Sequence, residues 1–346
     1  MLASLMLLVP AGAQAKVPAS FFGVSAVGPS QKDFQRMGRI GLGSYRFSIN
    51  WRAVQPTRKA DFRWGETDAS VRHAAENGIR PAPLLFGTPH FIDRSGTRLI
   101  PPTGSKEERQ LWQRFLVAAA RRYGPDGQFW VENPAVPMMP VREWIIWNEQ
   151  NARPYWRPRP DPRDYGSLVK ISDLAISAVD PEARIVLGGI YGYPHDSRSI
   201  PAKEFLRKLY RVRDIKKHFE AVDLHPYGAG VATVRKQVKQ ARSVIRRAGD
   251  RNAGILIGEL GWGSRGPKRS PSVVGAKGQA NRIRGAMEML ISKRKRWNIT
   301  GAYIYVWRDF TNETSCLWCP FAGLVDKRGE EKPALRALKQ VIRANR

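Results

Sequence analysis

The sequence predicts an α/β protein built as a (β/α)8, or TIM, barrel, and three observations lead to that expectation. Short β-branched or aromatic runs alternate with longer amphipathic stretches, which indicates parallel strands joined by helices. Eight such units fit in a chain of 346 residues, a size typical of this barrel. The alternative, a doubly wound open sheet, would want a Gly-rich phosphate fingerprint after its first strand, and Val27-Gly28-Pro29-Ser30 is not one.

The expected strands are the β-branched or aromatic runs at residues 21–26, 43–50, 80–86, 142–147, 185–189, 221–225, 254–258 and 301–306. Helices are expected between them, at residues 32–41, 67–77, 106–122, 163–178, 203–219, 231–248, 272–294 and 333–342. In the helix at 106–122, one face carries Leu111, Phe115, Leu116 and Ala119. Several of these helices start after Ser, Thr or Asp, the residues that cap helix N-termini.

The first fifteen residues have a different character from the rest of the chain. They contain no charge, they are apolar from Leu2 to Pro10, and Ala13-Gln14-Ala15 has the small-residue pattern that signal peptidase cleaves. The stretch is too short to span a membrane. We therefore expect residues 1–15 to be a secretory signal peptide, with a short uncleaved anchor as the alternative. Residues 16–346 are expected to form a single domain, secreted or held in the cell envelope.

The chain is strongly basic, with 58 Lys and Arg against 30 Asp and Glu and a formal net charge of +28. The basic residues are scattered along the chain, and no nucleic-acid-binding motif accompanies them. A nucleic-acid partner is therefore not expected. Association with an acidic envelope polymer and a cationic surface without a specific partner both stay open, and we expect a monomer.

The only two cysteines lie close together in Cys316-Leu317-Trp318-Cys319. This spacing suits redox chemistry, half a zinc site or a small disulfide loop. No second C-x-x-C is present and the five histidines show no paired spacing, so no metal site is expected. Because the motif falls in a loop near the C-terminus of an exported chain, we expect a Cys316–Cys319 disulfide.

Two glutamates directly follow apolar strands, Glu149 after the fourth and Glu259 after the seventh. Catalytic groups of such barrels project from the carboxyl ends of the strands. Either glutamate alone could simply form a salt bridge. Two carboxylates facing each other across a barrel mouth, however, predict cleavage of a glycosidic bond, in which one protonates the leaving oxygen and the other attacks the sugar or activates water.

At these residues the sequence resembles the clan A glycoside hydrolases, a group of retaining (β/α)8 enzymes. The run Trp147-Asn148-Glu149 is similar to the clan's Asn-Glu acid/base motif, and Ile257-Gly258-Glu259 to its strand-seven nucleophile. Asp223-Leu224-His225-Pro226-Tyr227 is similar to its His-x-Tyr element, and Arg46 and Trp307 fall where the clan has an Arg and a Trp. The W-N-E-x-N form resembles family 39 and cellulase-like family 5, although Gln150 stands where many such sequences carry Pro.

The resemblance, which covers nearly all of the chain after residue 15, implies Glu149 as acid/base, Glu259 as nucleophile and no cofactor. Asn148 can bond the sugar 2-hydroxyl, unless it is only a turn amide. Arg46 can keep Glu259 ionised, unless it pairs with Asp223 or Asp309.

The remaining candidates would bind the sugar or support the carboxylates. Tyr227 can donate to the nucleophile, and His225 is either a site residue or a packed histidine. Trp307 offers a flat face for the sugar at the cleavage point. Neighbouring subsites are expected to be lined by Trp51, Trp262, His90 and Trp156.

The sequence thus predicts a secreted retaining glycoside hydrolase acting on a β-linked glycan. A non-catalytic glycan-binding barrel of the envelope and a polyanion binder are the alternatives. If configuration is retained, the carboxyl groups of Glu149 and Glu259 should lie roughly 5–5.5 Å apart, whereas about 8 Å or more would favour inversion.

Overall fold

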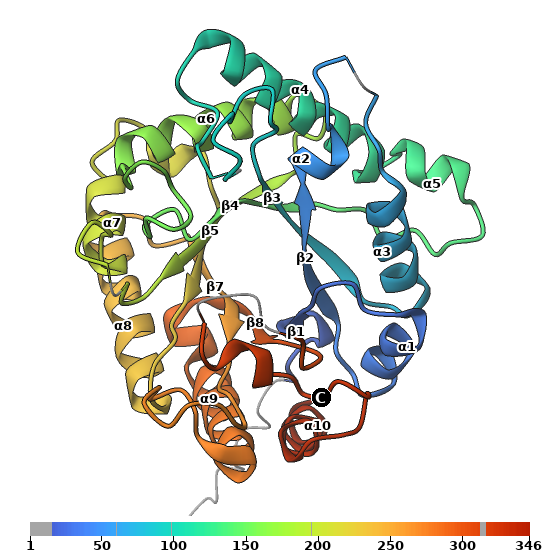
Figure 1. The fold of residues 1–346 in the computed structure, drawn as a ribbon, viewed down its shortest axis with the longest axis vertical. Helices are drawn as coiled ribbons and strands as arrows, with labels where there is room; N and C mark the ends of the chain where they lie inside the picture. Colours follow the sequence, from blue (N-terminus) through green and yellow to red (C-terminus); the bar gives the residue numbers. More distant parts are fainter. Residues whose placement is uncertain (1–15, 60, 98, 195, 312–315) are drawn as a thin grey trace, which may run out of the picture.

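Eight parallel strands close into one barrel in the computed structural model, which describes residues 16–59, 61–97, 99–194, 196–311 and 316–346. Each strand pairs with its neighbours in the sequence, and β8 returns to β1 (Figure 1). This is the predicted (β/α)8 barrel, and closure excludes the open sheet. The expected signal peptide lies outside the described residues. The strands are β1 (Phe22–Ser25), β2 (Ser44–Asn50), β3 (Arg80–Phe86), β4 (Glu143–Asn148), β5 (Arg184–Tyr191), β6 (Ala221–His225), β7 (Gly254–Leu260) and β8 (Ile299–Tyr305).

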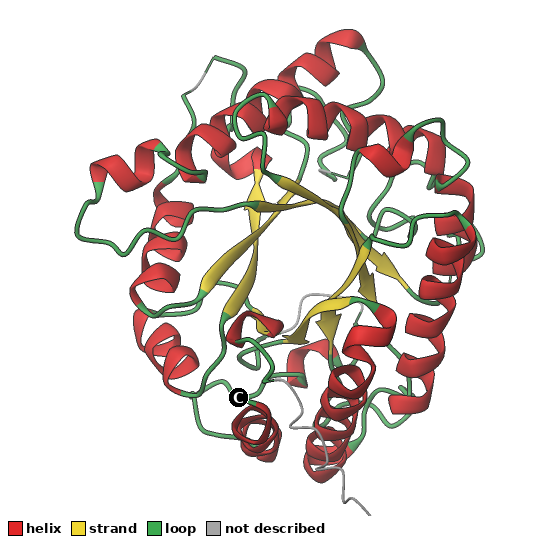
Figure 2. Cartoon of the chain, turned by 180° about the vertical axis from the view of Figure 1, so that it is seen from behind, coloured by secondary structure: helices red, strands yellow, loops and turns green. Residues whose placement is uncertain are grey.

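A ring of helices surrounds the strands (Figure 2). Two helices begin with a capping box, Ser30 with Asp33 and Ser105 with Glu108, in which each side chain bonds the other's backbone N–H. The helices are α1 (Gln31–Arg39), α2 (Trp51–Val54), α3 (Gly65–Glu76), α4 (Lys106–Tyr123), α5 (Gln128–Glu132), α6 (Pro162–Ser177), α7 (Ala202–Leu209), α8 (Val231–Arg247), α9 (Gly275–Trp297) and α10 (Pro333–Asn345), with 3-10 turns η1 (Ala19–Phe21), η2 (Ile215–Lys217) and η3 (Cys319–Phe321).

One expected helix is wrong in its length. The apolar spacing predicted a helix over 203–219, but α7 ends at Leu209. Asp214 has a φ of 57°, a left-handed conformation that a right-handed helix does not contain. The chain therefore turns there, and the short η2 continues with Ile215 buried.

The core has two layers, one on each side of the strands. A small cluster fills the barrel itself, with Ala82, Leu84, Ile145, Val186, Ala221, Leu256 and Tyr303 all buried. A much larger apolar cluster lies between strands and helices. Because both of their faces are buried, several strands carry continuous apolar runs, such as residues 144–147 of β4 and 255–257 of β7, as parallel strands do. The interior is thus packed, and ligand chemistry is confined to the barrel's end.

The strand register brings polar side chains from distant segments to one rim. Asn148 at the end of β4 pairs with Gly189 of β5, and Tyr191 of β5 pairs with His225 at the end of β6. Because all strands are parallel, their carboxyl ends gather at the same rim. None of the helices in the described part of the chain combines the length and apolar character that a membrane span requires.

Candidate active site

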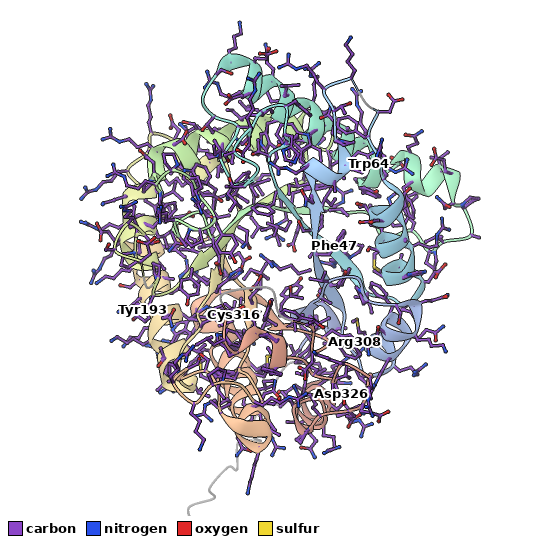
Figure 3. All side chains as sticks on the ribbon, viewed as in Figure 1. Phe47, Trp64, Tyr193, Arg308, Cys316 and Asp326 are labelled. Carbon is purple, nitrogen blue, oxygen red and sulfur yellow. A yellow bond between two sulfur atoms is a disulfide. The ribbon has the colours of Figure 1, made fainter. Side chains whose placement is uncertain are left out.

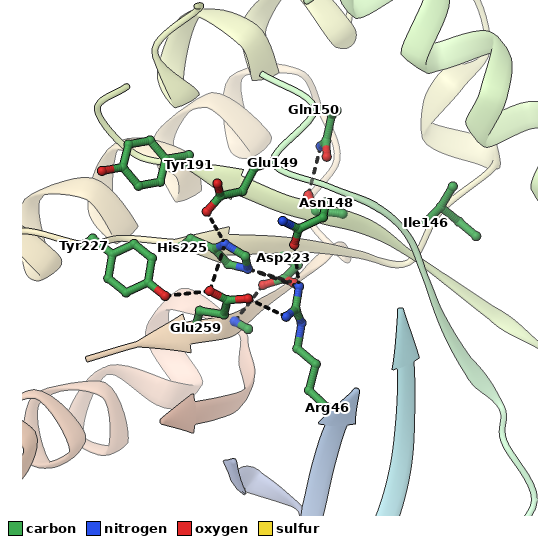
Figure 4. A network of polar contacts seen from close by, with 12 residues as sticks. Arg46, Ile146, Asn148, Glu149, Gln150, Tyr191, Asp223, His225, Tyr227 and Glu259 are labelled. Carbon is green, nitrogen blue, oxygen red and sulfur yellow. Dashed lines mark hydrogen bonds and ion pairs between the residues drawn. The ribbon is translucent and has the colours of Figure 1, made fainter. Parts of the chain in front are cut away.

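Glu149 and Glu259 meet at the carboxyl-terminal rim, from β4 and β7 (Figure 4). One carboxylate oxygen of each, together with a ring nitrogen of His225, lies within 4.8 Å of the others. This close approach of one oxygen from each carboxylate is consistent with the roughly 5–5.5 Å separation of the carboxyl groups in retaining glycosidases.

The backbone that presents Glu149 is unusual. Trp147 and Glu149 have φ values of 69° and 44°, in the left-handed region that side chains such as Trp seldom occupy. The backbone N–H of Glu149 donates to the carbonyl of Gly189 at 2.9 Å, and the side-chain amide of Gln150 donates to the carbonyl of Gly188 at 2.9 Å. Gln150 therefore anchors the chain after the motif to β5.

Glu259 is held by two strong donors. Arg46 Nη1 donates to its Oε1 at 2.6 Å, and the Tyr227 hydroxyl donates to its Oε2 at 2.6 Å. Burial alone would raise the pKa of Glu259, but the charges of His225 and Arg46 and the hydrogen bond from Tyr227 outweigh it, so the pKa lies below its usual value. The carboxylate is thereby kept ionised.

Glu149 has the opposite balance. Burial raises its pKa above the usual value, and the hydrogen bond from His225 offsets this only in part. His225 Nδ1 lies 2.8 Å from Glu149 Oε1. The surroundings therefore shift the two pKa values in opposite directions. In such a pair one carboxyl group can stay protonated and act as the acid, while the other stays ionised.

His225 is buried and lies against both carboxylates, Glu149 and Glu259. Burial opposes its protonation, but Glu259, Asp223 and Glu149 outweigh burial and raise the pKa of His225 to about 10. Its Nε2 lies 3.3 Å from Nη2 of Arg46, which can only donate. Nδ1 carries a proton both in the imidazolium and in the neutral tautomer whose Nε2 accepts, so Nδ1 donates to Glu149 in either state. A Cβ at Gly189 would overlap the imidazole, so glycine lets the ring lie there.

Arg46, in the middle of β2, connects several of these groups. Its Nη2 donates to Asn148 Oδ1 at 3.0 Å, and its Nε lies 3.7 Å from Asp223 Oδ2. The other partner considered from the sequence, Asp309, instead pairs with Lys332 at 2.9 Å. Asn148 is thus part of the site, with its amide oxygen turned toward Arg46.

The tryptophan expected at the cleavage point, Trp307, and the three expected to line neighbouring subsites are all buried, so these expectations were wrong. Trp307, Trp262, Trp51 and Trp156 are each at most 1% exposed. The indole of Trp307 donates to Asp33 Oδ1 of α1 at 2.7 Å. Because β8 ends at Tyr305, side-chain alternation does not extend to Trp307.

The other three are core residues as well. Trp262 donates to the Gly228 carbonyl at 2.7 Å and Trp51 to Gln55 at 2.9 Å, while Trp156 packs against Trp147 and Tyr165. Indole N–H groups that have found partners inside the protein are typical of buried Trp. His90 lies exposed on the rim, with Nε2 3.3 Å from Arg52 Nη1.

Four aromatic residues missed by the sequence analysis surround the carboxylates, and all are half-buried: Tyr155, Tyr191, Tyr305 and Trp318. The charge of Glu149 is the main cause that raises the pKa of Tyr155. Burial, then Glu149, raises the pKa of Tyr191 to about 12. Burial, then both glutamates, raises the pKa of Tyr305. The sequence could have indicated Tyr305, because side chains alternate along a strand and Tyr305 therefore lies on the same face of β8 as Tyr303, which points into the barrel.

Glu149, His225 and Glu259 offer the atoms that a metal ion would need. However, Arg46 and Tyr227 already donate to both oxygens of Glu259. A cation there would lie beside a guanidinium, so the set suits hydrogen bonding better than metal binding.

No protein-family model matches the sequence, and no curated protein matches it. Solved structures share its fold. A GH39 enzyme from Xanthomonas axonopodis pv. citri is 17% identical with a TM-score of 0.71, over 97% of this chain and 69% of that one. A GH39 β-xylosidase from Caulobacter crescentus is 19% identical with a TM-score of 0.67, over 95% and 72%.

A family 39 glycoside hydrolase from Bacteroides cellulosilyticus WH2 is also 19% identical, with a TM-score of 0.67, over 94% of this chain and 63% of that one. The chain therefore spans less than two thirds of the Bacteroides protein. At these identities the similarity shows a common fold, the barrel of family 39 glycoside hydrolases, which agrees with the resemblance found in the sequence.

Proposed function

We propose that this protein is a retaining glycoside hydrolase that cleaves β-glycosidic bonds in an oligo- or polysaccharide. The observation that carries the proposal is the carboxyl pair itself, with oxygens within 4.8 Å and pKa values shifted in opposite directions. A non-catalytic glycan-binding barrel would have no use for such a pair.

In the first step, an oxygen of ionised Glu259 attacks the anomeric carbon and the bond to the leaving oxygen breaks. Glu149 transfers its proton to that oxygen. His225 Nδ1–H holds Glu149 Oε1, which leaves Oε2 to carry the proton toward the substrate. The products are a glycosyl ester on Glu259 and a free alcohol.

In the second step, Glu149, now ionised, removes a proton from water. The water oxygen attacks the anomeric carbon and Glu259 leaves as a carboxylate. Two inversions give net retention. Arg46 and Tyr227 stabilise the carboxylate that re-forms, and the Asn148 amide nitrogen is left to donate to the sugar 2-hydroxyl.

The proposal also covers where the protein acts, its oligomeric state and its substrate. The apolar N-terminus of the sequence supports export to the medium or the cell envelope. The high net positive charge supports action as a monomer and capture of an acidic envelope polymer. The glycan is β-linked, and because one protein of similar fold is described as a β-xylosidase, β-xylosides come first among candidate substrates.

A panel of aryl β- and α-glycosides and β-linked oligosaccharides tests the proposal, with NMR reading the anomer released first. Hydrolysis of a β-glycoside should give the β-anomer first. Glu259→Ala should abolish turnover. The matched control Glu143→Gln, at the opposite end of β4 in a pair with Arg184, should keep it. An α-anomer released first would contradict retention, and failure on every β-glycoside would contradict the function.

A further inference from the structure

We propose that Trp318, on the Cys316–Cys319 disulfide loop, is a sugar-binding platform of this site. The inference rests on the proposed function and deepens it, because it assigns the residue against which a pyranose ring of the substrate packs. None of the four tryptophans that the sequence analysis expected to contact the sugar can take this part, since all four are buried.

Trp318 is in direct contact with the tyrosines beside the nucleophile. Its ring centroid lies 5.0 Å from that of Tyr227 and 6.0 Å from that of Tyr305, at interplanar angles of 65° and 71°. The hydroxyl of Tyr227 bonds Glu259, so one aromatic ring separates Trp318 from the carboxylate. Trp318 is partly exposed, and the C–H face of a pyranose packs on such an aromatic surface.

The chain leaving β7 also lies against this tryptophan. A Cβ built on Gly261 would lie 3.5 Å from the Trp318 ring, and one on Gly263 would lie 3.0 Å from Trp318 Cβ. Gly261 follows Glu259 by two residues. Trp318 therefore belongs to the same wall of the barrel mouth as the nucleophile, and a sugar bound to Glu259 has this ring within reach.

The loop that carries Trp318 is fixed at many points. A disulfide joins Cys316 to Cys319, and the Cys319 amide lies 3.3 Å from Cys316 Sγ. Phe310 donates to the Pro320 carbonyl at 3.1 Å. Figure 3 shows Cys316 inside the ring of helices.

The carbonyl of Phe321 anchors the other end of the loop. It accepts from the Ser264 amide at 2.9 Å and from Lys332 Nζ at 3.0 Å. A platform fixed before the ligand arrives loses little conformational entropy on binding. The disulfide thus positions Trp318, and breaking it should weaken sugar binding without touching the carboxylates.

The test compares Trp318→Ala, Trp318→Phe and Cys316→Ser/Cys319→Ser with the unchanged full chain. Trp318→Ala should raise KM for the best oligosaccharide on the order of tenfold, with kcat changed less than about threefold. Trp318→Phe should restore much of the loss. Reductant should raise KM of the unchanged protein but not that of the double serine variant. Trp64→Ala is the control, since Trp64 lines a groove together with residues of α4 and lies apart from Cys316 in Figure 3.

Oligosaccharide binding by calorimetry, in a Glu149→Gln background, separates the two proposals. Loss of binding in Trp318→Ala supports the platform even if the unchanged protein hydrolyses nothing, a result that would overturn only the proposed function. Hydrolysis by the unchanged protein, with KM and binding unaltered in Trp318→Ala, would overturn the platform.

Discussion

Glu149 and Glu259 are the same kind of residue in the same rim, and their neighbours make them different. Glu259 receives donors from Arg46 and Tyr227, which outweigh its burial. Glu149 is bonded to His225, which lowers its pKa, but its burial prevails. The charge of His225 lowers the pKa values of both glutamates, and its removal should raise both.

The pH dependence of kcat/KM tests this balance. Glu259 must be ionised and its pKa lies below 4.5, so activity should fall only below about that pH. Glu149 must be protonated and its pKa lies above 4.5, so activity should fall again at higher pH. His225→Asn should shift both the acidic limb and the basic limb of this pH profile to higher pH, each on the order of one pH unit.

His218→Asn is the control for that profile, since His218 pairs with Asp173 away from the carboxylates. It should leave both limbs in place. Limbs that stay put in His225→Asn, or that move to lower pH, would contradict the roles given to these residues.

The two glutamates were predictable from sequence, whereas most of the aromatic lining was not. A residue at the end of an apolar strand has a direction fixed by strand alternation, which holds for Glu259 within β7. Trp307 lies two residues beyond the end of β8, where alternation no longer applies. Trp318 lies in a loop whose course only the folded chain determines, and so its place beside Tyr227 left no signal in the sequence.

At the scale of the element, β7 shows how the strand itself shapes the site. The amide of Gly258 donates to Asp223 Oδ1 at 2.6 Å, and a Cβ at Gly258 would overlap that carboxylate. Asp223 in turn lies 3.7 Å from both Arg46 Nε and His225 Nε2. Glycine is therefore required at position 258, directly before the nucleophile, because a side chain there would keep the buried carboxylate of Asp223 from approaching β7.

Gly258→Ala should lower the free energy of unfolding by about 1–3 kcal/mol, because the added methyl overpacks a buried polar site. Gly285→Ala is the matched control. It lies in α9, where the nearest atom to a Cβ is 3.5 Å away, so it should stabilise by ~0.4–1 kcal/mol. Urea unfolding of both variants measures the difference. Equal stability of Gly258→Ala and the unchanged protein would contradict the close packing at Asp223.

At the scale of the whole molecule, the barrel was predictable because eight strand–helix units leave few other topologies. The length of the helix predicted over 203–219 was wrong because the local apolar spacing disagrees with the course of the folded chain. The apolar spacing continues past Leu209, yet the left-handed Asp214 turns the chain. The net charge of +28, by contrast, is a property of the surface that the fold does not explain.

If that charge gathers an acidic glycan, catalysis should depend on salt. Raising ionic strength from about 0.01 to 0.15 M shortens the Debye length from about 30 to 8 Å. Hydrolysis of an acidic polymer should then fall several-fold, while a neutral aryl glycoside is unaffected. Equal responses of the two substrates would mean that the charge plays no part in substrate capture.

Azide rescue tests the division of labour between the two glutamates most directly. In Glu149→Ala an activated aryl β-glycoside still forms the ester on Glu259, and azide, which needs no base, should restore turnover and give the β-glycosyl azide. In Glu259→Ala the nucleophile is missing, so activity should fall by several orders of magnitude and azide can give only the α-azide. An α-azide from Glu149→Ala, or a loss that is equal for good and poor leaving groups and is not rescued, would contradict the assignment.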